Sequence, residues 1–95
     1  MVPDISQITG IDDFTTKKES DRELYYKSEH VFLVKNHNTI EIRTDEKLGS
    51  FLKEKYESVM ESRYFGRGGI EIVLANQLDN QEVEDLIRLS YNLTK

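Results

Sequence analysis

The chain has 95 residues, of which 33% are charged and 37% hydrophobic, and a net charge of −5 at pH 7. This length predicts one small domain that buries roughly two-thirds of the surface of its unfolded chain, which argues against a deep enclosed active site. The absence of cysteine excludes disulfides and thiolate metal sites, and no apolar run approaches the roughly 18 residues of a membrane span. We therefore expect a cytoplasmic protein that does not associate with membranes.

The first part of the chain, residues 1–21, lacks a sustained hydrophobic period. Isoleucine or phenylalanine recurs every third residue from Ile5 to Phe14, but residues 15–21 are wholly polar. This pattern predicts a short turn of helix followed by a mobile linker. We accordingly place a single folded domain at residues 22–95.

Three segments rich in strand-favouring residues follow, at 24–27, 31–35 and 39–43. Short polar breaks separate them, and the second break, at residues 36–38, carries two asparagines that suit a hairpin turn. In the third segment Ile40 and Ile42 fall on one face of the strand. The three segments predict an antiparallel meander.

A helix is predicted next, because Thr44 and Asp45 offer an N-cap and apolar residues then recur at helical spacing. We expect this helix to end between residues 58 and 62. Its apolar stripe consists of Leu48, Phe51, Leu52, Tyr56, Val59 and Met60.

The last third of the chain predicts a strand at residues 70–74 and a second helix. Asp79 and Glu82 form a pair of the capping-box type, and an apolar stripe from Val83 to Leu93 follows. The element order is then β-β-β-α-β-α. We predict an α+β fold in which an antiparallel sheet packs against two helices.

The order of these elements resembles the MmcQ/YjbR family of small bacterial proteins over about residues 24–94. The resemblance is carried by the strand Ile70–Leu74, the turn Leu78–Asp79, and a final helix with Asp85-Leu86-Ile87 and Ser90-Tyr91-Asn92-Leu93. It implies a frataxin-like (CyaY-like) domain, here as a short variant with a reduced N-terminal portion. The resemblance also implies DNA as a partner.

A basic, aromatic and glycine-rich stretch at residues 63–69 is the strongest candidate site. Arg63 and Arg67 could contact phosphates while Tyr64 stacks on a base, with Lys35 and Arg43 as secondary contacts. A plain connection between helix and strand, with Phe65 packed on the core, explains the same residues.

No spacing in the sequence indicates catalytic residues, a metal site or a cofactor, so we predict a protein that is not an enzyme. Two hypotheses remain for its function. The first is weak DNA binding, which the net charge of −5 opposes. The alternative is a protein-interaction or homo-oligomerisation module without a nucleic-acid role.

Overall fold

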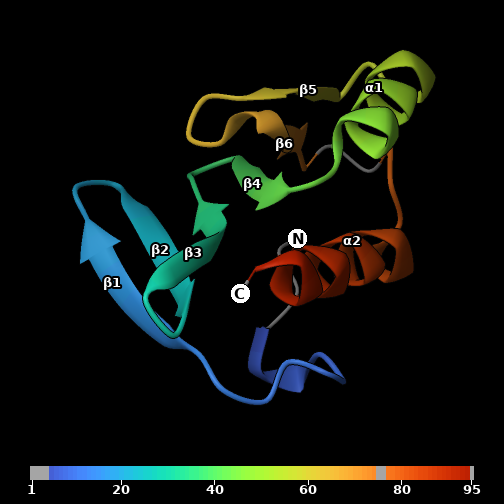
Figure 1. Ribbon diagram of the computed structural model, residues 1–95. Helices are drawn as coiled ribbons and strands as arrows, with labels where there is room; N and C mark the ends of the chain where they lie inside the picture. Colours follow the sequence, from blue (N-terminus) through green and yellow to red (C-terminus); the bar gives the residue numbers. More distant parts are fainter. Residues whose placement is uncertain (1–4, 75–76, 95) are drawn as a thin grey trace.

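The computed structural model describes residues 5–74 and 77–94 and shows an α+β architecture (Figure 1). None of the helices in these ranges is long and apolar enough to cross a membrane. The elements follow one another as η1 (Ile5–Gln7, a 3₁₀ turn), β1 (Thr15–Glu19), β2 (Arg22–Lys27), β3 (His30–Lys35), β4 (Thr39–Arg43), α1 (Glu46–Lys55), β5 (Val59–Ser62), β6 (Gly66–Val73) and α2 (Asn80–Leu93).

One six-stranded sheet runs in the order β1-β2-β3-β4-β6-β5, and every neighbouring pair is antiparallel. The predicted meander is confirmed as β2, β3 and β4. Beyond it, β6 pairs with β4 and leaves β5 at the outer edge. The sheet therefore ends at β1 on one side and at β5 on the other.

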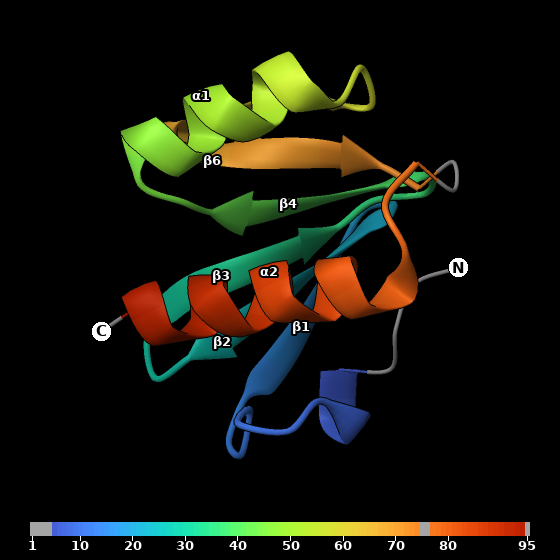
Figure 2. The same cartoon turned by 90° about the vertical axis from the view of Figure 1, so that its right-hand side faces the viewer.

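Both helices cover the same face of the sheet (Figure 2). α1 contacts β5 and β6, while α2 contacts β3 and β4. Between the helices and the sheet lies the main hydrophobic core, which includes Ile40, Ile42, Ile70, Ile72 and Ile87. Within residues 5–74 and 77–94, the opposite face of the sheet carries no helix.

Aspartate side chains cap both helices, as the sequence predicts. Asp45 accepts a hydrogen bond from the Leu48 N–H at 2.7 Å, and Asp79 accepts one from the Glu82 N–H at 2.8 Å. Each bond satisfies a backbone donor that the first helical turn leaves without a partner. The first residues of α1 and α2 are thus determined by the aspartate that directly precedes each helix.

A buried serine ties α2 to the sheet. The Ser90 hydroxyl donates to the Phe32 carbonyl oxygen at 2.5 Å and accepts from the Arg43 N–H at 2.8 Å. Because Ser90 is fully buried, these two bonds replace contacts with water. They fix α2 against β3 and β4.

The expectation of a mobile linker before residue 22 is wrong for residues 15–19, which form β1. β1 pairs with β2 from Thr15 opposite Tyr26 to Glu19 opposite Arg22. Four of its five side chains are exposed, so its sequence lacks the alternation that marks a half-buried strand. Pairing with β2, rather than burial, makes this segment a strand.

The segment before β1 is also part of the core. Ile5, Ile8 and Ile11 are buried there. Arg88 Nε donates to the Thr9 carbonyl oxygen at 2.6 Å, which joins this segment to α2. The predicted turn of helix is present as η1.

The first helix is shorter than predicted, because the backbone becomes extended at Tyr56 and Val59–Ser62 forms β5. The predicted apolar stripe extended too far in consequence. Phe51 is 57% exposed and Met60 is 43% exposed, although both were expected to face the core. With β1 and β5 added, the order is β-β-β-β-α-β-β-α rather than β-β-β-α-β-α.

A second, smaller apolar cluster lies on the helix-free face of the sheet. It consists of Leu24, Val31 and Val34, with Tyr26 and Phe65 packed against it. Phe65 belongs to the connection between β5 and β6, which folds back over this face. Phe65 thus packs on this smaller cluster rather than on the main core, and the connection joins two strands rather than a helix and a strand.

Candidate binding groove on the helix-free face

Two glutamates occupy equivalent places at the centre of the sheet. Glu41 lies between Ile40 and Ile42 on β4, and Glu71 lies between Ile70 and Ile72 on β6. Since the isoleucines face the helices, strand alternation directs both carboxylates to the helix-free face. Glu41 and Glu71 are direct partners in the β4–β6 register, and they are 1% and 3% exposed.

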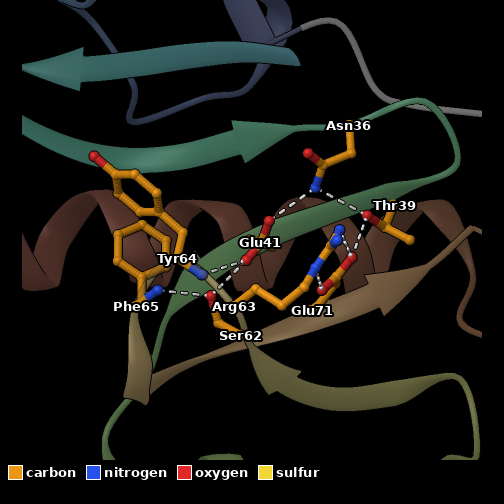
Figure 3. Close-up of polar contacts among 8 residues, drawn as sticks. All are labelled: Asn36, Thr39, Glu41, Ser62, Arg63, Tyr64, Phe65 and Glu71. Atoms are coloured by element: carbon orange, nitrogen blue, oxygen red, sulfur yellow. Dashed lines mark hydrogen bonds and ion pairs between the residues drawn. The ribbon is translucent and has the colours of Figure 1, made fainter. Parts of the chain in front are cut away.

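Glu71 forms an ion pair with Arg63. Arg63 reaches it with two hydrogen bonds, from Nε to Oε1 at 3.0 Å and from Nη2 to Oε2 at 2.9 Å (Figure 3). The Thr39 hydroxyl donates a third, to Oε2, at 2.7 Å. This two-pronged geometry is the strong form of an arginine–carboxylate contact.

Glu41 receives neutral donors only (Figure 3). Its Oε1 accepts from the Ser62 hydroxyl and from the Tyr64 N–H, each at 2.8 Å. Its Oε2 accepts from Asn36 Nδ2 at 2.8 Å. Within the described residues, Glu41 forms no ion pair within 4.0 Å.

Burial alone would raise the pKa of Glu41, because it penalises the charged form. The three hydrogen bonds just described outweigh burial, with help from the positive charge of Arg63. The pKa of Glu41 therefore lies below its ordinary value of 4.5. The carboxyl group is ionised at neutral pH.

Glu41 lies at the base of a groove of about 710 Å³ on this face. The β1–β2 turn and the β3–β4 turn form two of its walls, and the connection after β5 forms the third. The groove is lined by Glu19, Ser20, Asp21, Arg22, Asn36, His37, Asn38, Thr39, Glu41, Arg63 and Tyr64. Polar and charged side chains thus surround the buried carboxylate.

Arg22 and Tyr64 contact each other at the rim of the groove. Arg22 Nη2 lies 2.6 Å from Glu19 Oε1, and its guanidinium carbon lies 5.5 Å from the centre of the Tyr64 ring. Tyr64 is 40% exposed and packs edge-on against Phe65. Tyr64 is therefore partly exposed, with Arg22 and Phe65 in contact with its ring.

Of the five residues predicted to bind nucleic acid, only Arg63 and Tyr64 line this groove. Lys35 Nζ lies 3.7 Å from Glu23 Oε1. Arg43 donates from Nε to the Val31 carbonyl oxygen at 2.7 Å and lies over the Phe65 ring.

Arg67 lies in a separate pocket beside α1, together with Glu46, Lys53 and Glu61. The structure therefore distributes the five predicted side chains over several sites. Even Arg63, which lines the groove, is occupied by Glu71. The five predicted side chains thus do not all line one pocket.

The sequence analysis missed Glu41 and Glu71 as site residues. A signal for them exists, because an acid flanked by two isoleucines occurs once on β4 and once on β6. A charged residue in the middle of a strand that is otherwise buried requires partners on the opposite face. Those partners come from the β3–β4 turn and the β5–β6 connection.

Comparisons of the chain with protein-family models, with curated proteins and with solved structures found no match. The resemblance to the MmcQ/YjbR family accordingly stays a prediction. What is established is an α+β domain with a six-stranded antiparallel sheet, two helices on one face, and a polar groove on the other.

Proposed function

We propose that this chain is a non-catalytic binding module that docks a partner protein in the groove on the helix-free face. The observation that carries the proposal is the groove itself, which is open, polar and built around a buried carboxylate. Arginine and tyrosine, the residue types enriched at the energetic centres of protein interfaces, lie at its rim as Arg22, Arg63 and Tyr64.

Charge favours a protein over a nucleic acid as the occupant. The groove contains the carboxylates of Glu19, Asp21 and Glu41, and its two arginines already bond to carboxylates. A phosphate backbone would have to displace Glu19 from Arg22, or Glu71 from Arg63, before it gained a cation. Nucleic-acid affinity depends on free cations, so weak DNA binding is the second candidate.

The second candidate rests on a specific pair of side chains. Arg63 is 75% exposed along its side chain despite its contact with Glu71, and Tyr64 follows it directly. One face of such a guanidinium can still meet a phosphate while the tyrosine stacks on a base. DNA binding through this pair would fall steeply as salt is raised.

A comparison of groove variants tests the proposal. The wild-type protein and a Tyr64→Ala/Arg22→Ala variant are immobilised and exposed to a nuclease-treated lysate of the cell that makes the protein. We expect a protein that the wild type retains and the groove variant loses. Arg67→Ala, which alters the pocket beside α1, is the matched control and should retain that protein.

Two results would overturn the proposal. One is retention of the same proteins by the groove variant and the wild type. The other is tight, salt-sensitive binding of a fluorescent DNA duplex that Arg63→Ala weakens, which would favour the nucleic-acid candidate instead.

We also propose, from the sequence resemblance, that the chain is a member of the MmcQ/YjbR family with a frataxin-like architecture and a cytoplasmic location. The support is the order of sequence motifs over residues 24–94, which ends in the Ile70–Leu74 segment, the Leu78–Asp79 turn and the Ser90-Tyr91-Asn92-Leu93 segment. Superposition on an experimental structure of a family member tests the architecture, and cell fractionation tests the location.

A further inference from the structure

The two buried glutamates of the sheet differ in how their charges are balanced. Both come from an Ile-Glu-Ile segment, and both are almost wholly removed from water. Glu71 has an arginine bonded through two nitrogens, whereas Glu41 has only an amide, a hydroxyl and a backbone N–H. Buried charges in proteins are normally paired with an opposite charge. Among the described residues, Glu41 is the one of these two carboxylates that lacks such a partner.

Glu41 is 1% exposed, and its less occupied oxygen is Oε2. Among the described residues, Oε1 accepts two hydrogen bonds, whereas Oε2 accepts one, from Asn36 Nδ2. Asn36 lines the groove and divides its amide between Glu41 and Thr39 Oγ1, at 2.8 and 3.0 Å. A charged donor that enters the groove can therefore replace a neutral, shared donor.

The remaining charges of the groove also favour a cation. Arg22 is bonded to Glu19, and Arg63 is bonded to Glu71. Among the described residues, Asp21 and Glu41 line the groove without an ion pair within 4.0 Å. The groove as a whole thus has an excess of negative charge.

We infer that the groove binds the guanidinium group of an arginine side chain from the partner protein, paired with Glu41 and flanked by the ring of Tyr64. This inference rests on the proposed function and specifies the partner chemistry. A guanidinium group supplies charged N–H donors, one of which can bond to Oε2 of Glu41 as Arg63 Nη2 bonds to Oε2 of Glu71. Its flat face can also lie against a tyrosine ring, and Tyr64 is 40% exposed, with the Arg22 guanidinium already 5.5 Å from its ring centre.

Other ligand classes fit the groove less well. An anion would meet the Glu41 carboxylate. Among the described residues, no group of three or more histidines and acids could hold a metal ion. A lysine ammonium is a compact point charge without a planar face, so it would gain less from Tyr64.

The test uses the full chain and a small probe, N-acetyl-arginine methylamide, titrated while amide signals are followed by NMR. We expect saturable shifts of the Asn36 side-chain amide and the Tyr64 N–H, both of which bond to Glu41. The citrulline analogue has nearly the same shape without the charge, and should bind at least about tenfold more weakly. Inorganic phosphate should leave both signals in place.

Substitutions of Glu41 and of its neighbour Asn36 should change the affinity for the arginine probe in different ways. Glu41→Gln should reduce the affinity for the arginine probe at least about tenfold, which corresponds to about 1.4 kcal/mol. Asn36→Ala removes the competing donor and should bind the probe at least as well as the wild type. The citrulline comparison on the wild-type protein remains decisive even if Glu41→Gln does not fold.

Equal binding of the arginine and citrulline probes would overturn the inference, as would shifts confined to residues outside the groove. If the wild type retains a partner that the groove variant loses, yet the arginine probe does not bind, then the inference fails while the proposed function stands. A lysine probe that binds more tightly than arginine would likewise reject the guanidinium group.

Discussion

Substitution of Gly69 by alanine should destabilise the protein, whereas the same change at Gly68 should not. A Cβ atom at Gly69 would overlap the Ile42 carbonyl oxygen and would lie 2.7 Å from Phe65 Cβ. At Gly68 the nearest atom would be the Phe65 carbonyl oxygen at 3.6 Å, an ordinary contact. Neither glycine has a positive φ, so the two positions differ mainly in space.

The magnitude follows from two opposing effects. Forcing a methyl group into a filled site costs about 1–3 kcal/mol, and here one of the obstructing atoms belongs to the backbone of β4. Alanine also restricts the unfolded chain, which returns about 0.4–1 kcal/mol. We expect Gly69→Ala to lose about 1–2 kcal/mol of unfolding free energy, and Gly68→Ala to lose none.

Thermal unfolding followed by circular dichroism measures the difference. For a domain of this size, 1 kcal/mol corresponds to a shift in Tm of about 4–8 °C. The Tm of Gly69→Ala should therefore fall well below that of Gly68→Ala. Equal Tm values for the two variants would refute the close packing of β4, β6 and Phe65.

Three further predictions concern polar contacts. Ser90→Ala removes the partners of the buried Phe32 carbonyl and of the partly buried Arg43 N–H and should cost about 1–3 kcal/mol in urea unfolding, while Ser50→Ala, on the exposed side of α1, should change little. Asp79→Ala removes the cap of α2 and should cost about 1 kcal/mol; unchanged stability would contradict the capping role. The pKa of Glu41 is lower in the folded state, so its contribution is complete above pH 4.5 and is lost as the pH falls through the folded pKa. The Glu41→Gln variant should accordingly lose less unfolding free energy than the wild type when the pH falls below 4.5. If the unfolding free energies of the two proteins change in parallel with pH, the ionised Glu41 carboxylate does not stabilise the fold.

Sequence patterns predicted the parts of the fold that depend on burial and on local capping. The isoleucines of β4 and β6 face the helices, and Asp45 and Asp79 begin α1 and α2 as expected. The two edge strands escaped prediction for a shared reason. β1 has exposed side chains, and β5 follows directly after a helical pattern, so neither has a hydrophobic period of its own.

The site was harder to predict than the fold, because its partners lie far apart in the sequence. The contacts of Glu41 with Ser62 and Tyr64 span 21 and 23 positions, and they exist only because β6 lies between β4 and β5. The sequence analysis placed Gly69 in a glycine-rich candidate site or in a connection between helix and strand, at residues 63–69. In the structure this glycine lies in β6, where it makes room for Phe65 and a neighbouring strand.

The two margins of the sheet have a consequence for association between molecules. β1 carries the consecutive lysines Lys17 and Lys18, whose side chains alternate between the two faces of the strand, and β5 has only four residues with an irregular register at Glu61 and Ser62. Charged and short outer strands of this kind resist the addition of a further strand from another chain. Concentrated solutions of the protein should accordingly be protected against edge-to-edge stacking, which leaves the broad faces as the places where molecules meet.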